Sequence, residues 1–199
     1  MKNLMSMALK YVKIMILTAL LAAGMMFALY QLPDSLAILK VIISLMFLAF
    51  QYVILWDNFV VFGAKDSRTE AHLRRGAADG IDTSAEPIRF YPYKGWLAAL
   101  IGSVPWWLIY IASIVSRFVN LDPNIGSNVI FKFLYMFTNM PCYTIFLRLG
   151  LPDAIPFAFI IPLIISLAVA GTAYLCGHVY RFRVEKDARN RKYKHNVLD

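Results

Sequence analysis

The chain has 199 residues, of which 60% are hydrophobic and only 16% are charged, whereas soluble domains carry about 25% charged residues. Long uncharged apolar runs, such as 14–30 and 41–56, exclude an ordinary soluble domain and indicate a membrane protein. The formal charge of +8 would suit nucleic-acid binding in a soluble protein, but here Lys and Arg flank the apolar runs. We therefore expect anionic lipid headgroups as partners, and no nucleic acid.

The first predicted transmembrane span covers residues 12–30. Lys residues precede it, as in a secretory signal peptide, but its apolar run is longer than most cleavable signals, so we interpret it as a retained helix. A turn at 32–35 leads to the second predicted span, 36–62, which exceeds the ~20 residues that a bilayer needs. This span is expected to tilt or to leave Lys40 and Asp57 at the two membrane interfaces.

Residues 63–94 form a polar segment that separates the second and third spans. The Ser-Arg-Thr-Glu motif beginning at Ser67 has the pattern of a capping box, which predicts a short helix from Ser67 to about Gly80. The aromatic and basic sequence 90–96 is typical of the lipid headgroup level. A third predicted span, 97–116, follows it.

The fourth apolar stretch, 129–149, is ambiguous, because it carries two basic residues and is interrupted by Asn139, Pro141 and Cys142. The last predicted span, 157–180, is unambiguous and leads into a basic tail, 181–199. Glu and Asp lie four residues before Arg in this tail, a spacing that favours a helix continuing out of the membrane.

The distribution of basic residues decides between four and five crossings. If 129–149 does not cross, 16 of the 20 Lys and Arg residues lie on the side of the N-terminus, as the positive-inside rule expects. We therefore predict an all-α integral membrane protein of the cell membrane with four transmembrane helices. Both termini and the 63–94 loop are expected in the cytoplasm, with 129–149 as a broken re-entrant or interfacial segment on the outer face. Five crossings are the alternative, because the rule has exceptions.

Two ionisable residues near the cytoplasmic ends of spans are candidates for a polar site. Asp57 in the second span and His178 in the last are expected at a similar depth, where they could form a proton-responsive pair. The alternative is that Asp57 lies in the headgroup layer beside Trp56, and that His178 interacts with the carbonyl groups at its helix end.

Prolines suggest a second candidate, a cavity beside broken backbone. Pro105, followed by Trp106 and Trp107, removes a backbone hydrogen bond in the third span and predicts a kink, and Asn139 and Pro141 interrupt the fourth stretch. Kinked and discontinuous helices border ligand sites in transporters. The tryptophans could equally fill the space beside the kink or belong to the aromatic belt.

Two further surfaces stand out near the C-terminus. Small residues on one face of the last span predict a helix-packing surface, formed by Ser166, Ala170, Ala173 and Gly177. Basic residues of the tail are candidates for contact with lipid headgroups, namely Arg181, Arg183, Lys186, Arg189, Arg191, Lys192 and Lys194. Topological retention alone would also explain the basic residues.

The sequence contains no motif of a known catalytic site, so we expect neither an enzyme, nor a cofactor, nor a metal. Cys142 and Cys176 are predicted at different membrane depths, which argues against a disulfide between them. Two hypotheses follow. The chain is a small transport-related or permease-like component, or it is a non-catalytic scaffold or accessory subunit whose cytoplasmic loop and tail bind a membrane or cytoplasmic protein or anionic lipid.

Overall fold

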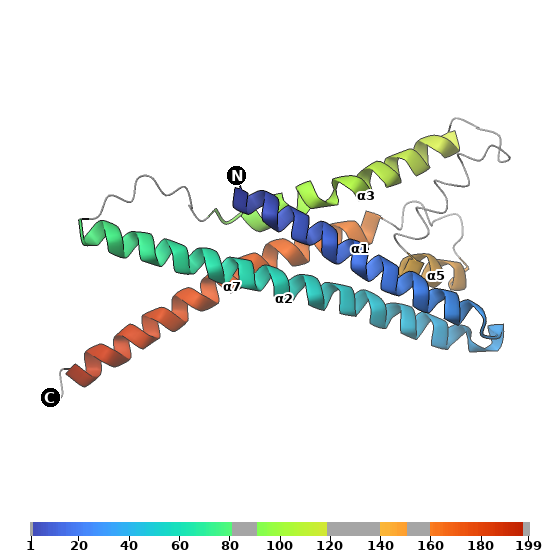
Figure 1. The fold of residues 1–199 in the computed structure, drawn as a ribbon. Coiled ribbons are helices and arrows are strands. Elements are labelled where there is room, and N and C mark those ends of the chain that lie inside the picture. Colours follow the sequence, from blue (N-terminus) through green and yellow to red (C-terminus); the bar gives the residue numbers. More distant parts are fainter. Residues whose placement is uncertain (1, 81–90, 119–139, 151–159, 197–199) are drawn as a thin grey trace.

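A computed structural model describes residues 2–80, 91–118, 140–150 and 160–196 of the chain. Every regular element within these ranges is helical (Figure 1). The elements in chain order are α1 (Lys2–Tyr30), the 3-10 turn η1 (Asp34–Leu36), α2 (Ala37–Ala78), α3 (Lys94–Phe118), α5 (Met140–Arg148) and α7 (Ile160–Asn196).

Four of these helices are long and apolar enough to cross a membrane, as predicted. The candidate spans within the described residues are Asn3–Leu29, Ala37–Leu73, Lys94–Ala112 and Ile160–Tyr180. Large apolar side chains, such as Phe27, Ile38 and Leu108, are exposed along their outer faces. Burying such side chains in lipid is favourable, so these faces fit the hydrocarbon of a bilayer.

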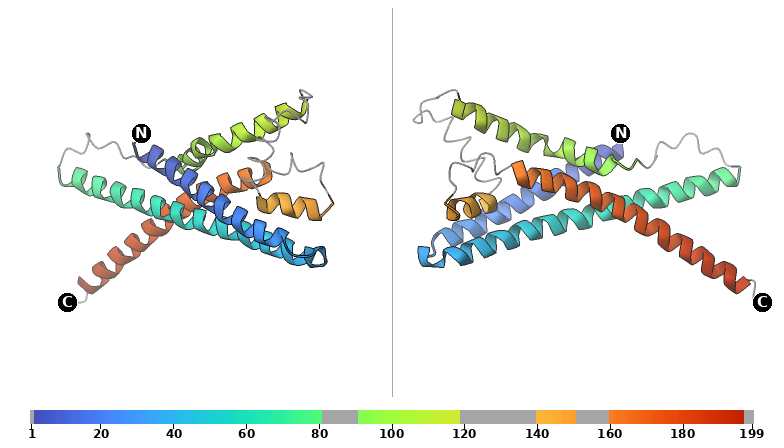
Figure 2. Two further views of the ribbon diagram at one scale, coloured as in Figure 1. Left: turned by 45° about the vertical axis from the view of Figure 1, so that its right-hand side comes forward. Right: turned by 180° about the vertical axis from the view of Figure 1, so that it is seen from behind.

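The four long helices alternate in direction along the chain. In Figures 1 and 2, α1 and α3 run one way, while α2 and α7 run the opposite way. Contacts agree with this picture, because the C-terminal half of α2 meets the first residues of both α1 and α3, through Asn3 and Lys94. α2 and α7 cross each other and extend beyond the N-terminal end of α1 (Figure 1).

The second helix is much longer than the predicted span. α2 continues without a break from Ala37 to Ala78, so the prediction of a separate helix opening at Ser67 is wrong. Ser67 is buried in the interior of α2, where the backbone donors that a cap would satisfy are already bonded within the helix. The predicted end near Gly80 is confirmed, since the Asp79 amide donates to the Arg75 carbonyl and Gly80 has φ of 76°.

Glycines allow α2 and α7 to cross with their backbones in contact. A Cβ atom on Gly63 would lie 2.0 Å from the carbonyl oxygen of Tyr174, and one on Gly177 would lie 2.1 Å from the carbonyl oxygen of Val60. Small residues drive helix association in membranes because they permit such close approach. The crossing point is thus fixed by two glycines on different helices.

The apolar core lies around this crossing, where α1, α2, α3 and α7 converge. Tyr11 of α1 is fully buried against Phe59 of α2, with ring centroids 6.3 Å apart in an edge-to-face arrangement. A second, smaller cluster joins α5 to α2 and α3 through Cys142, Leu48 and Tyr110. The described helices therefore pack most closely at the end where α1 and α3 begin.

Candidate functional site

A buried carboxylate lies at the convergence of four helices. Asp66 of α2 is 3% exposed. Its oxygens accept hydrogen bonds from the Asn3 side-chain amide of α1 at 2.9 Å and the Tyr174 hydroxyl of α7 at 2.6 Å. The Lys94 ammonium of α3 donates to the same carboxylate and forms an ion pair with it. We call Asn3, Asp66, Lys94 and Tyr174 the Asp66 cluster.

Helical spacing brings these groups together. Phe59, Gly63 and Asp66 lie on one face of α2, which is the face that packs against α7. Lys94 is the first residue of α3, so its side chain starts at the end of the bundle where α1 also starts. Tyr174 reaches Asp66 because Gly63 of α2 leaves room for its backbone and Gly95 of α3 leaves room for its side chain.

The hydrogen bonds and the ion pair of the Asp66 cluster connect four helices. A buried charge is costly unless it is paired and hydrogen-bonded, and Asp66 has one cationic and two neutral donors. Removing one partner of a buried ion pair typically costs about 3–5 kcal/mol. Within the described residues no group of His, Cys, Asp and Glu is arranged to hold a metal. The cluster therefore joins four helices at one end of the bundle.

Asp57 and His178, which were predicted to form a pair, lie in different surroundings from each other. Asp57 is exposed on α2, about 120° around the helix from Gly63, which faces α7. Nε2 of His178 lies 3.9 Å from the carboxylate of Glu70. Glu70 lies one turn beyond Asp66, so this contact joins α2 and α7 next to the Asp66 cluster.

The predicted kink residues on α3 divide between its exposed side and the core of the bundle. Pro105 lies within α3, on its exposed side. Trp106 is buried in the core, where its indole N–H has no hydrogen-bond partner among the described residues, and Trp107 donates to the Ser103 hydroxyl at 3.1 Å. Pro141 is buried in the first turn of α5, whereas Asn139 lies outside the described residues. The transport interpretation stays a prediction.

The small residues of the last span lie inside the bundle. Ser166, Ala170 and Ala173 are fully buried, and Gly177 meets Val60 of α2. The Ser166 hydroxyl also lies 2.6 Å from the hydroxyl of Tyr11. The predicted tail continues α7 as a helix to Asn196, but the side chains from Arg181 onward lie outside the described part.

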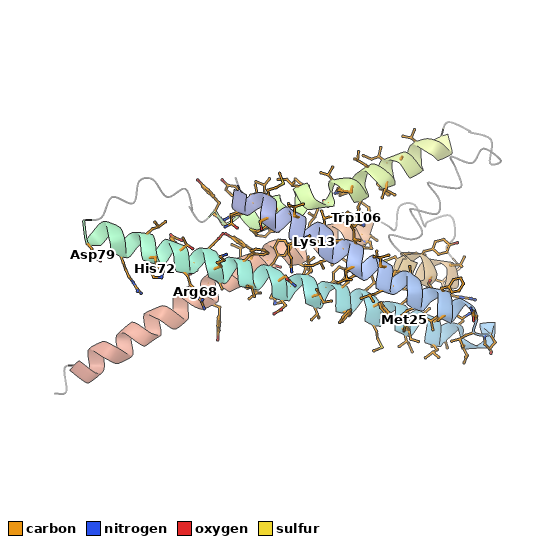
Figure 3. All side chains as sticks on the ribbon, viewed as in Figure 1. Lys13, Met25, Arg68, His72, Asp79 and Trp106 are labelled. Carbon is orange, nitrogen blue, oxygen red and sulfur yellow. The ribbon has the colours of Figure 1, made fainter. Side chains whose placement is uncertain are left out.

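A basic surface that the sequence analysis missed lies on α2. Four exposed residues spaced by three, four and three positions form one helical face, and we call them the basic stripe: Lys65, Arg68, His72 and Arg75. Arg68 and His72 lie on the section of α2 beyond the start of α1 (Figure 3). The spacing was visible in the sequence, but it becomes meaningful only when residues 65–75 form one uninterrupted helix.

No family model matches this chain, no curated protein is significantly similar to it, and no solved structure matches it.

Proposed function

We propose that this protein is a non-catalytic membrane scaffold that holds an acidic partner protein at the cytoplasmic surface. The basic stripe carries this proposal, because it places three Lys or Arg residues and His72 on one exposed face of the polar C-terminal part of α2, the helix that holds the second candidate span. Complementary charge gives specificity and fast association at protein interfaces.

The α2 extension, residues 67–78, is suited to presenting a binding surface. It continues the apolar part of α2 without a break and extends about 18 Å beyond Asp66, at 1.5 Å per residue. Asp66 ties its base to α1, α3 and α7, and the Glu70 contact with His178 supports it one turn further out. A surface that is already ordered loses less conformational entropy on binding than a flexible loop does.

The length of the stripe favours a protein over lipid as its partner. Arg75 lies about 15 Å further along the helix than Lys65. Charges are largely screened beyond a Debye length of about 8 Å at physiological salt. A bilayer surface next to Lys65 would therefore attract Arg75 only weakly, whereas a protein docked along α2 would contact the entire stripe.

The cytoplasmic location rests on charge and on helix direction. Opposite directions of α3 and α7 support an even number of crossings, and with four crossings 16 of the 20 Lys and Arg residues fall on the side of the stripe. We therefore propose that both termini and the α2 extension lie in the cytoplasm.

Site-specific photocrosslinking in cells tests this function. A photoreactive residue at His72 is expected to form a crosslink to one acidic protein, and the variant Arg68→Gln/Arg75→Gln is expected to reduce that crosslink several-fold. The matched control Lys10→Gln/Lys13→Gln removes the same charge from exposed positions of α1 and should leave the crosslink yield unchanged. Equal loss in both variants, or a crosslink confined to lipid or to a second copy of the chain, would reject the scaffold function.

A further inference from the structure

A groove on the surface of the bundle is separate from the Asp66 cluster and the basic stripe. It lies between α1 and α2 and has a volume of about 420 Å³. Its lining residues are Met5, Ser6, Leu9, Lys10 and Lys13 of α1 and Phe62 of α2. An apolar floor beside two ammonium groups and a hydroxyl is the pattern expected for an amphipathic anion.

The position of the two lysines within α1 strengthens this reading. Helical side chains lean toward the N-terminus of their helix, so Lys10 and Lys13 direct their ammonium groups toward Ser6 and away from the apolar part of α1. C-terminal to Lys13 the exposed face of α1 is apolar, with Ile16, Leu17, Leu20 and Leu21. The groove thus spans the transition from a charged to a lipid-facing surface.

We infer that the groove binds one anionic phospholipid. Lys10, Lys13 and the Ser6 hydroxyl hold its phosphate, and an acyl chain lies against Leu9 and Phe62 before continuing along the exposed apolar face of α1. Charge complementarity argues for an anionic lipid, since basic residues near the membrane surface are attracted to anionic headgroups.

The nearby carboxylates do not cancel this positive charge. Asp57 lies about 140° around α2 from Phe62 and thus on a different flank of the helix. Asp66 is buried and paired with Lys94. Lys65 of the basic stripe lies three residues after Phe62 but is not one of the residues that line the groove.

Lipid binding to the purified full-length protein tests the inference. The protein is placed in phosphatidylcholine nanodiscs and titrated with phosphatidylglycerol, and bound lipid is counted by native mass spectrometry. Lys10→Gln/Lys13→Gln is expected to weaken phosphatidylglycerol binding by about 30-fold. The control Arg68→Gln/Arg75→Gln removes the same charge from the basic stripe and is expected to change it by less than about threefold.

A second variant separates the groove from general charge attraction. Leu9→Trp keeps both lysines but fills the apolar floor, so it should reduce phosphatidylglycerol retention while leaving the unfolding free energy close to that of the wild type. Equal weakening by both charge variants, full retention in Leu9→Trp, or displacement of the lipid by inorganic phosphate at similar concentration would each overturn the inference.

Discussion

Replacing Asp66 by Asn tests how the Asp66 cluster holds the bundle together. The change keeps the size of the side chain but leaves the Lys94 ammonium, in a side chain 11% exposed, without its counter-charge. It also weakens the hydrogen bonds from Asn3 and Tyr174. Breaking one side of a buried ion pair costs about 3–5 kcal/mol, and we expect a loss of that size in the free energy of unfolding.

The assay is SDS titration of the protein in mixed micelles, with unfolding monitored by tryptophan fluorescence. Asp57→Asn is the matched control, because it makes the same change at an exposed position of the same helix and should cost less than about 0.5 kcal/mol. The double variant Asp66→Asn/Lys94→Met removes both charges and should recover at least about 1 kcal/mol. Equal stabilities of the Asp57 and Asp66 variants would refute the reasoning.

Two further stability predictions concern the helix crossings. Gly63→Ala places a Cβ atom 2.0 Å from the Tyr174 carbonyl oxygen and should lower the free energy of unfolding by about 1–3 kcal/mol in the same SDS titration. Gly24→Ala meets nothing within 4 Å and should raise the free energy of unfolding by about 0.5–1 kcal/mol. Tyr11→Phe removes the contact with Ser166 and should cost about 0.6 kcal/mol, because Ser166 keeps its bond to the Leu163 carbonyl. A loss of several kcal/mol for Tyr11→Phe, or identical effects of the two alanines, would contradict the described packing.

The membrane class could be predicted because apolar length is a property of the sequence alone. Runs such as 14–30 and 41–56 need no knowledge of their neighbours to be recognised as spans. The end of α2 near Gly80 was also predictable, since glycine readily adopts the positive φ of a helix C-terminus.

The Asp66 cluster could not be predicted, because its members come from four segments far apart in the chain. Asn3 and Asp66 are 63 residues apart, and Asp66 and Tyr174 are 108 apart. The prediction ended the second span at residue 62 and opened a new helix at Ser67, so Asp66 was not placed on the same helix as Phe59 and Gly63. Tertiary packing overrides the capping-box motif here, because contact with α7 stabilises α2 as one continuous helix through this region.

The continuity of α2 underlies the Asp66 cluster, the basic stripe and the proposed scaffold function, and a single distance measurement tests it. Val61 and Arg75 are both exposed on α2 and can be replaced by spin-labelled cysteines after both native cysteines are changed to serine. One uninterrupted helix predicts a narrow distribution centred at about 21 Å by electron spin resonance in liposomes. A broad distribution, as expected for a polar loop beginning after the membrane span, would contradict the account.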